Sequence, residues 1–301
     1  MAKDLQRTTS RMRALLARPG CLVAPGVADA FAARMVLMEG FEAVYMTGFG
    51  TSLTRLGMPD VGLLTASEMI DNASRIVDAS GLPVIADADT GYGNPMNVRR
   101  TIHEYERAGV AGVHLEDQAW PKRCGHLAGK RVIPIAEMEA KLMAAVDSRR
   151  DADFIVMART DAIAVEGFEA ALERGERYRA AGADVIFIEA PTSVAQLEVI
   201  GQRFKGVPLL YNMAASGKTP DLDNASMARL GFRIAIFPNW LLLAAIPAMR
   251  RMLHELKTKG GVADIRNEVA TFKEFTEIAG LPEVQELENR YGLPEDQRAG
   301  L

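Results

Sequence analysis

Charged side chains recur in pairs, two residues apart, at the ends of short apolar runs. Three such pairs occur: Asp87 with Asp89, His114 with Glu116, and Arg159 with Asp161. Because side chains alternate along a strand, the members of each pair share one face. Buried carboxylates repel one another, so a cation is expected among them. Oxygen ligands in a chain with only four histidines favour Mg²⁺, with Mn²⁺ as an alternative, over Zn²⁺.

A second group lies in the segment Pro121–Lys130, where one thiol stands among cations. The thiol is Cys124, and the cations are Lys122, Arg123, His126 and Lys130. Neighbouring positive charge lowers the pKa of a thiol, which predicts an acid, base or nucleophile near neutral pH. A basic loop that only docks an anion remains the alternative. The other cysteine, Cys21, lies in an apolar run and is expected in the core.

Eight short apolar runs must position these residues. They begin at Cys21, Ala43, Pro83, Gly112, Phe154, Val185, Pro208 and Ile234. Runs without polar alternation are typical of parallel strands buried on both faces, and the segments between them have helical spacing. Starts 22 to 42 residues apart favour a (β/α)₈ TIM barrel over an open sheet. None of the runs contains a Lys, which argues against Schiff-base chemistry.

Composition limits the remaining choices. The chain has 301 residues, a formal charge of −4 and 49% hydrophobic residues, so neither a disordered chain nor a strongly basic nucleic-acid binder is expected. The longest apolar run near the end is too short for a membrane span, and the N-terminus reads as a helix. Two isolated cysteines indicate a reducing, cytoplasmic setting. We expect a barrel over residues 1–240 and a helical segment over 241–301, within one structural domain.

Five ordered motifs resemble the isocitrate lyase/phosphoenolpyruvate mutase superfamily. They are Asp87–Gly93, Glu116–Gln118, Lys122–His126, Ala158–Asp161, and Asn212–Met213 followed by Gly217–Pro220. The Lys-Arg-Cys-Gly-His stretch resembles its lyase branch, which includes 2-methylisocitrate and 2,3-dimethylmalate lyases. The similarity runs from about Ala24 to the end of the chain. It implies a Mg²⁺-dependent barrel and a homotetramer, a dimer of dimers that exchange the eighth helix.

The resemblance also implies roles for individual residues. Asp87 would bind the metal directly. Three further acids, Asp60, Asp89 and Glu116, would bind it directly or through water. Asp60 is also expected to contact the substrate. The backbone of Thr47, Gly48 and Phe49 would hold the carboxylate end of the product. Arg159 would pair with the reacting oxygen or carboxylate. The remaining pocket residues would be Gly125, His126, Glu189 and Asn212.

The implied reaction is cleavage of a C–C bond in a 2-hydroxy di- or tricarboxylate, giving a keto acid such as pyruvate and a carboxylate. Cys124 would protonate the carbanion, Tyr45 would be the base, and His126 would assist. The segment Asn212–Gly217 lacks the Glu that such lyases tend to carry, and Phe49 and Trp240 are bulky for a tricarboxylate. Oxaloacetate hydrolysis, phosphonopyruvate P–C chemistry and carboxylate binding without turnover remain alternatives.

Overall fold

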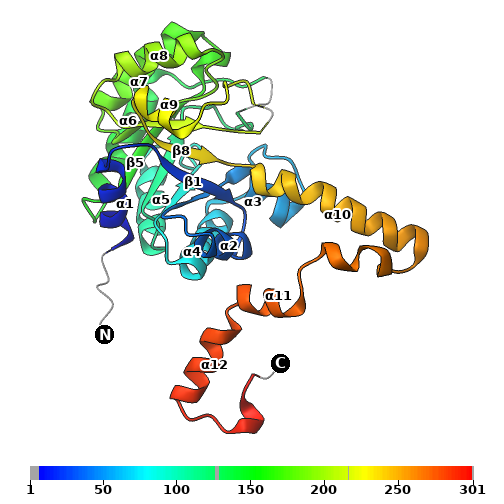
Figure 1. Cartoon of the computed structure of the whole chain (residues 1–301). Coiled ribbons are helices and arrows are strands. Elements are labelled where there is room, and N and C mark those ends of the chain that lie inside the picture. The colour runs from blue at the N-terminus through cyan, green and yellow to red at the C-terminus, as the bar shows by residue number, and fades with distance from the viewer. Residues whose placement is uncertain (1–6, 126–128, 216, 300–301) are drawn as a thin grey trace. The chain divides into compact units, whose positions relative to one another are not determined.

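The computed structural model describes residues 7–125, 129–215 and 217–299. Eight parallel strands close into a barrel in sequence order, with β8 hydrogen-bonded back to β1 (Figure 1). The strands are β1 (Leu22–Val27), β2 (Val44–Met46), β3 (Val84–Asp87), β4 (Gly112–Glu116), β5 (Ile155–Thr160), β6 (Val185–Ile188), β7 (Leu209–Asn212) and β8 (Phe232–Phe237). Each strand overlaps one of the eight apolar runs, so the predicted (β/α)₈ barrel is confirmed.

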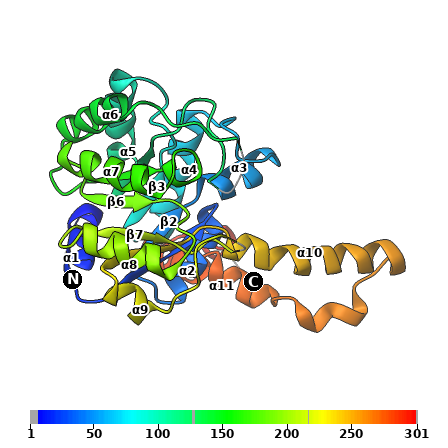
Figure 2. The ribbon, with the colours of Figure 1, turned by 90° about the horizontal axis from the view of Figure 1, so that it is seen from above.

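Helices connect the strands and surround them (Figure 2). Those of the barrel are α1 (Thr8–Ala17), α2 (Ala30–Met38), α3 (Gly48–Leu56), α4 (Ala66–Ser80), α5 (Pro95–Arg107), α6 (Ile135–Ser148), η1 (Ala162–Ala164), α7 (Phe168–Ala180), α8 (Val194–Arg203) and α9 (Asn224–Arg229). Local sequence sets their ends. Thr65 and Glu68 form a capping box at the start of α4, and Gly81 ends that helix with φ 61°.

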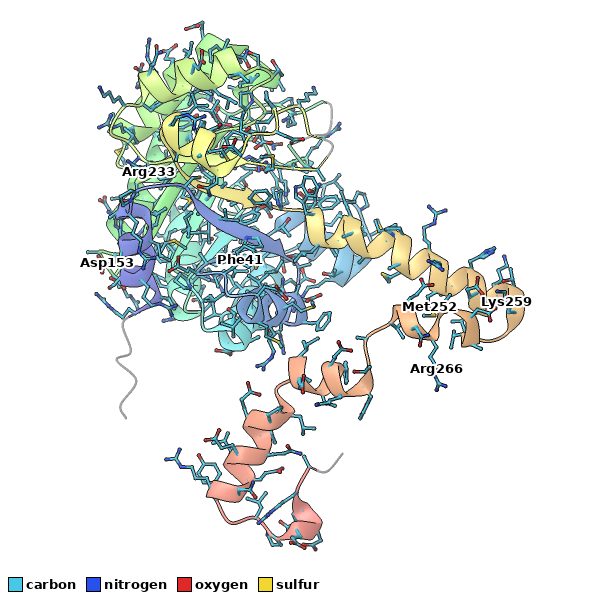
Figure 3. The ribbon with its side chains drawn as sticks, viewed as in Figure 1. Phe41, Asp153, Arg233, Met252, Lys259 and Arg266 are labelled. Carbon is cyan, nitrogen blue, oxygen red and sulfur yellow. The ribbon has the colours of Figure 1, made fainter. Side chains whose placement is uncertain are left out.

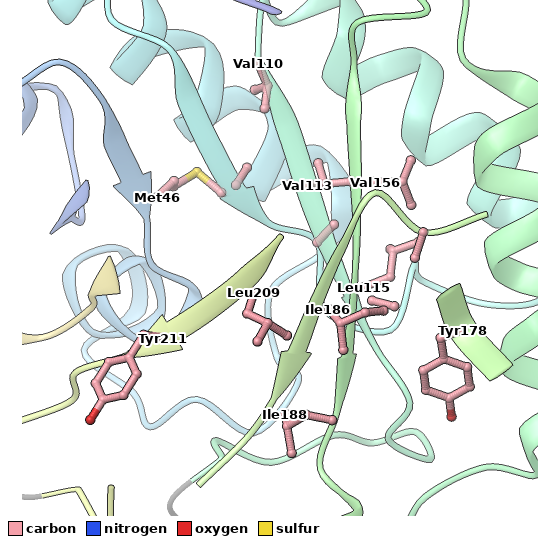
Figure 4. Close-up of a cluster of buried hydrophobic side chains, with 14 of the residues drawn as sticks. Met46, Val110, Val113, Leu115, Val156, Tyr178, Ile186, Ile188, Leu209 and Tyr211 are labelled. Carbon is pink, nitrogen blue, oxygen red and sulfur yellow. The ribbon is translucent and has the colours of Figure 1, made fainter. Parts of the chain in front are cut away.

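Alternating side chains of the strands fill two separate cores. Outward residues such as Met46, Val113 and Val156 pack between the barrel and its helices (Figure 4). Inward residues such as Tyr45 and Phe187 form a second cluster inside the barrel. The strands therefore have no solvated face, which explains their uninterrupted apolar sequence.

Helix α1 fills the end of the barrel where the strands begin. Its Met12 and Leu15 belong to the interior cluster. Arg13 Nη2 lies 2.9 Å from Asp184 Oδ1, just before β6, and Ser10 Oγ donates to Asp153 Oδ2 at 2.6 Å, just before β5 (Figure 3). Because α1 fills this end of the barrel, the open end is the one where the strands finish and where the polar residues lie.

The chain divides into two compact units, residues 1–242 and 243–301. Helix α10 (Trp240–Lys259) crosses the boundary, and the second unit continues with η2 (Ala263–Glu268), α11 (Phe272–Ile278), α12 (Leu281–Arg290) and η3 (Glu295–Gln297). Within it, Lys259 Nζ lies 2.7 Å from Asp264 Oδ2 (Figure 3). That the two units form one structural domain stays a prediction. Among the described residues, no helix has both the length and the apolar character needed to cross a bilayer.

Candidate active site

A cavity of about 320 Å³ lies at the C-terminal ends of the strands. Most of the predicted site residues line it: Tyr45, Thr47, Phe49, Asp60, Asp87, Glu116, Cys124, Gly125, Arg159, Glu189 and Asn212. Gly48 lies directly against Asp87, and Asp89 is buried beside the cavity. His126 lies outside the described residues. The fold thus gathers side chains up to 194 residues apart (Tyr45 to Asn239) around one space.

Lys122 is a buried cation among the acidic side chains. Its Nζ lies 2.5 Å from Asp60 Oδ1 and 2.6 Å from Asp89 Oδ1. Burial disfavours the charged ammonium, but Asp89, Asp87 and Glu116 outweigh this and raise the pKa of Lys122 well above its ordinary value. Lys122 therefore supplies part of the positive charge that the sequence-based prediction gave to a metal ion alone.

Asp89, predicted as a metal ligand, is turned towards Lys122. Its backbone has φ 48°, a left-handed conformation that Asp tolerates, and its N–H donates to Asp87 Oδ1 at 2.9 Å. Burial is the main reason why its pKa rises to about 6, although Lys122 acts in the opposite direction. Through this turn Asp89 supports the Asp87 carboxylate from behind.

Asp87 and Glu116 have the features of a divalent cation site. Burial raises the pKa of Glu116 well above its ordinary value, against the effect of Arg159, and the buried Glu116 Oε1 has no hydrogen-bond partner among the described residues. No three His, Cys, Asp or Glu side chains in the described part of the chain form a complete metal cage. Mg²⁺ commonly takes only one or two carboxylates and keeps water or substrate oxygens, so these residues fit it.

The start of α3 places backbone N–H groups beside Asp87. Thr47 caps the helix, with its side chain accepting from Gly50 N at 3.2 Å. The first N–H groups of a helix have no acceptor within it and favour anions. A Cβ at Gly48 would overlap the Asp87 carboxylate, so only glycine allows this approach. The N–H groups of Gly48 and Phe49 can therefore bind a substrate carboxylate.

Arg159 on β5 is held as a rigid carboxylate clamp. Its Nε lies 3.0 Å from Asp161 Oδ2, its Nη1 lies 3.5 Å from Glu116 Oε2, and the guanidinium stacks 5.1 Å from the Phe187 ring centre. Burial disfavours its charge, but Asp161 and Glu189 outweigh burial and raise the pKa of Arg159 well above its ordinary value. It stays charged and oriented, as bidentate recognition of a carboxylate requires.

Tyr45 and His114 form a buried pair at the floor of the cavity. Tyr45 Oη lies 2.9 Å from His114 Nε2. Burial raises the pKa of Tyr45 well above its ordinary value and lowers the pKa of His114 to about 4. Both groups are neutral at pH 7, so Tyr45 can act as the predicted base only if it passes its own proton onward.

The loop after β4 brings Cys124 to the cavity on backbone contacts. Cys124 N donates to Asp60 O at 3.0 Å. The Gln118 amide donates to Arg123 O at 2.8 Å and accepts from Arg123 N at 3.0 Å. The thiol is half-buried and outside any disulfide. The geometry permits proton transfer into the cavity, and the role of Cys124 stays a prediction.

Gly125 lies against the Arg159 clamp. A Cβ added there would come within 2.5 Å of Arg159 Nη2 and 2.9 Å of Glu189 Oε1. Lys130 Nζ donates to Gly125 O at 2.5 Å and to Asp161 Oδ1 at 2.7 Å. Two of the four predicted cations near the thiol, Lys122 and Lys130, are therefore paired with carboxylates.

Glu189 and Asn212 form the side of the cavity after β6 and β7. Asn212 Nδ2 donates to Glu189 Oε2 at 3.1 Å and to Oε1 at 3.3 Å. Asn212 Oδ1 is buried without a hydrogen-bond partner among the described residues. That oxygen can accept a hydrogen bond from a substrate hydroxyl.

The segment after Asn212, which lacks the Glu expected from the resemblance, forms part of an apolar wall. Its Ala214 and Ala215 line the cavity, as do Phe49, Pro59 and Pro238, which complete this wall. Asn239 Oδ1 accepts from Ala215 N at 2.9 Å and fixes the segment.

Trp240 does not narrow this pocket, contrary to the sequence-based expectation. It is absent from the residues that line the cavity, and its indole N–H donates to Met213 O at 2.6 Å. Phe49 alone of the two aromatic residues reaches the substrate space.

The sequence points to Lys122 and Asp161 without giving either its role in this site. It predicts Lys122 as a cation near the thiol, not as the counter-charge of the acids. It predicts that Asp161 shares a face with Arg159, not that it holds the guanidinium. Two further residues of the cavity were missed. Pro59 and Asn239 carry no local signal, since their positions depend on how loops fold over the barrel.

Comparison with known proteins identifies the family. The model of the phosphoenolpyruvate phosphomutase family matches residues 12–257. The 2,3-dimethylmalate lyase of Eubacterium barkeri is 47% identical over 94% of this chain and 98% of its own length. The chain belongs to the phosphoenolpyruvate mutase/isocitrate lyase superfamily. A second superfamily relative, the 2-methylisocitrate lyase of Aeropyrum pernix, is 43% identical over 92% of this chain and 89% of its own.

Solved structures of superfamily members are also similar to this chain in fold and in sequence. A 2,3-dimethylmalate lyase has a TM-score of 0.92 at 39% identity, covering 98% of this chain and 99% of its own. Oxaloacetate acetylhydrolase in complex with 3,3-difluorooxalacetate has a TM-score of 0.91 at 39% identity, covering 96% of this chain and 98% of its own. Phosphonopyruvate hydrolase in complex with oxalate and Mg²⁺ has a TM-score of 0.86 at 29% identity, covering 95% of this chain and 99% of its own. The prediction of a superfamily carbon–carbon lyase is confirmed by the named lyases among its relatives.

Proposed function

We propose that this lyase cleaves a small alkyl-substituted 2-hydroxy dicarboxylate of the 2,3-dimethylmalate type to pyruvate and a monocarboxylate such as propionate. The mixed lining of the cavity carries this proposal. Carboxylates, Lys122 and Arg159 line it, and so does the apolar wall that includes Phe49, Ala214 and Ala215. Methyl groups suit such a wall, whereas a third carboxylate would lose its hydration there.

Charge disfavours a third substrate carboxylate. Four carboxyl groups and two cations of the described residues line the cavity: Asp60, Asp87, Glu116 and Glu189, with Lys122 and Arg159. A bound Mg²⁺ would offset the excess negative charge if all six groups are ionised, which leaves no surplus positive charge in this lining. Each further carboxylate on a substrate then adds repulsion, so we expect 2-methylisocitrate, with three, to bind less well than 2,3-dimethylmalate, with two.

Asp87 and Glu116 would hold Mg²⁺, with Asp60 and Asp89 acting through water or Lys122. When bound, Mg²⁺ would polarise the hydroxyl and the adjacent carboxylate of the substrate and so assist loss of the hydroxyl proton. The similarity to phosphonopyruvate hydrolase, whose structure contains oxalate and Mg²⁺, supports this assignment.

The residues of the chain divide the remaining work. Arg159 and the N–H groups of Gly48 and Phe49 bind and orient the carboxylate next to the hydroxyl. Tyr45 Oη takes the hydroxyl proton while its own proton passes to His114 Nε2, which lies 2.9 Å away.

Cleavage leaves the bonding electron pair on the carbon next to the second carboxylate. Cys124 Sγ donates a proton to that carbon, which releases the monocarboxylate and leaves a thiolate. The thiolate is reprotonated from solvent as His114 gives up the proton that it took, so the cycle consumes no net proton. The glycine at 125 lets the segment that carries the thiol lie close to Arg159, since a side chain there would collide with the guanidinium.

Oxaloacetate hydrolysis is the second candidate, favoured by the similarity to oxaloacetate acetylhydrolase. The same clamp would bind oxaloacetate, but that substrate has no alkyl groups for the apolar wall. The wall therefore favours the lyase substrate.

We also propose that the chain works as a homotetramer, a dimer of helix-swapped dimers, in the cytoplasm. Large apolar side chains of α10, among them Met249 and Leu253, are exposed in the single chain, as an exchanged helix requires. Neither cysteine is in a disulfide, which suits a reducing compartment. Light scattering of the purified protein checks the assembly: a monomer at micromolar concentration would contradict it.

Kinetics on a substrate pair test the proposed function. Pyruvate release is measured with Mg²⁺ for 2,3-dimethylmalate and 2-methylisocitrate, since both yield pyruvate. We expect kcat/KM at least tenfold higher for the dicarboxylate and no turnover with EDTA. Equal or higher kcat/KM for the tricarboxylate would contradict the charge argument. The exposed Arg131, changed to Met, is the control variant and should match the parent.

A further inference from the structure

We infer that Lys130 and Asp161 are positioning residues that lock the Cys124 segment onto the Arg159 clamp. The inference rests on the proposed role of Cys124 as the proton donor, and it adds what holds that donor in place. Lys130 Nζ bridges two groups, Gly125 O at 2.5 Å and Asp161 Oδ1 at 2.7 Å.

Asp161 connects this bridge to the substrate clamp. The same carboxylate accepts from Arg159 Nε at 3.0 Å and from Arg159 Nη2 at 3.2 Å. Its side chain is fully buried, and that of Lys130 is 3% exposed. One carboxylate thus holds the carboxylate-binding arginine with two contacts and the thiol-bearing segment, through Lys130, with another.

Asp161 itself stands on a rigid base. Its N–H donates to Asp117 Oδ1 at 2.9 Å, and Thr160 Oγ1 donates to Asp117 Oδ2 at 2.7 Å. Arg174 Nη1 donates to the same Asp117 oxygen at 3.2 Å. Such support from behind is what keeps a reacting group within a fraction of an ångström of its target.

Other contacts hold residues 122–124 of the Cys124 segment, and Lys130 holds Gly125. Lys122 is held by its two acids, Arg123 by Gln118, and Cys124 N by Asp60 O. Among the described residues, Lys130 is the donor to the carbonyl of Gly125, next to the thiol residue. Removing Lys130 therefore frees Gly125, which lies against Arg159, while Arg159 keeps Asp161.

Two variants separate the roles by kinetics. Lys130→Met should lower kcat about 10- to 100-fold with KM within threefold of the parent, because proton donation is misplaced while the clamp remains. Asp161→Asn should lower kcat and also raise KM at least tenfold, because it disturbs Arg159 as well. Lys130→Arg should restore most of kcat, and Arg131→Met serves as the matched control with an exposed cation removed.

Hydrogen exchange of the full-length protein, read by mass spectrometry, gives a test that needs no activity. In Lys130→Met, amides within residues 118–125 should exchange at least tenfold faster, while peptides of β3 and β5 keep the parent rates. Unchanged exchange in 118–125, or a general increase that includes β3 and β5, would overturn the positioning role. If Lys130→Met does not fold, Asp161→Asn is compared with the parent at residues 118–125 and at β3 only, because Arg159 lies on β5. If the parent turns over no substrate, the proposed function fails, while the exchange result still decides this inference.

Discussion

Replacing Lys122 with Met removes a buried cation that contacts both Asp60 and Asp89. The contacts are 2.5 and 2.6 Å, and the three side chains are 2%, 6% and 4% exposed. Removing one partner of a buried ion pair costs about 3–5 kcal/mol, because the remaining charge is left without compensation. We expect this loss in the free energy of unfolding at pH 7.5 without Mg²⁺.

Low pH should reduce the loss of unfolding free energy that Lys122→Met causes. Asp89 already has its pKa raised to about 6 by burial, despite Lys122. Without Lys122 this pKa rises further, so at pH 5 the carboxyl is neutral in the variant and needs no cation. Urea unfolding followed by circular dichroism at both pH values measures the difference, with the exposed Lys205→Met as the control.

A loss below about 1 kcal/mol at pH 7.5, the value of a surface pair, would refute the reasoning. So would a loss that grows on acidification. Either result would mean that Lys122 is not the buried counter-charge of this acid cluster.

Three further predictions concern single residues. Cys124→Ser should lower kcat by roughly 10²- to 10⁴-fold, as for a lost general acid, with Mg²⁺ affinity by calorimetry unchanged; a fully active variant would exclude the thiol. Gly48→Ala should abolish turnover and weaken Mg²⁺ binding at least tenfold, because its Cβ displaces the Asp87 carboxylate, and parent-like Mg²⁺ affinity would contradict that contact. Burial lowers the pKa of His114 to about 4, so between pH 6.5 and 4 the unfolded chain binds a proton that the folded chain does not. On acidification over this range the parent should therefore lose roughly 3 kcal/mol of unfolding free energy relative to His114→Asn, and an equal pH dependence of the two proteins in urea unfolding would contradict it.

The barrel could be predicted because each strand is buried on both faces. Runs such as those at Val185 and Phe154 carry no polar alternation, and their spacing leaves room for one helix each. Periodicity also placed Arg159 and Asp161 on the same face, and the structure joins them at 3.0 Å.

Loop geometry lies beyond such patterns. Asp89 follows the end of β3, where a backbone φ of 48° replaces strand alternation and turns its carboxylate to Lys122. Lys130 reaches Asp161 across 31 positions of sequence, and Trp240 turns its indole to Met213 O. These contacts depend on long-range packing of loops, which no local period encodes.

Product detection by NMR in D₂O tests the central claim most directly. Mg²⁺-loaded protein is given 2,3-dimethylmalate, 2-methylisocitrate, oxaloacetate or phosphonopyruvate separately, each with an EDTA control. We predict pyruvate and propionate carrying one deuterium at C2 from 2,3-dimethylmalate, at the highest rate of the four and only with Mg²⁺. Oxalate and acetate from oxaloacetate, with 2,3-dimethylmalate untouched, would contradict the lyase substrate proposed here.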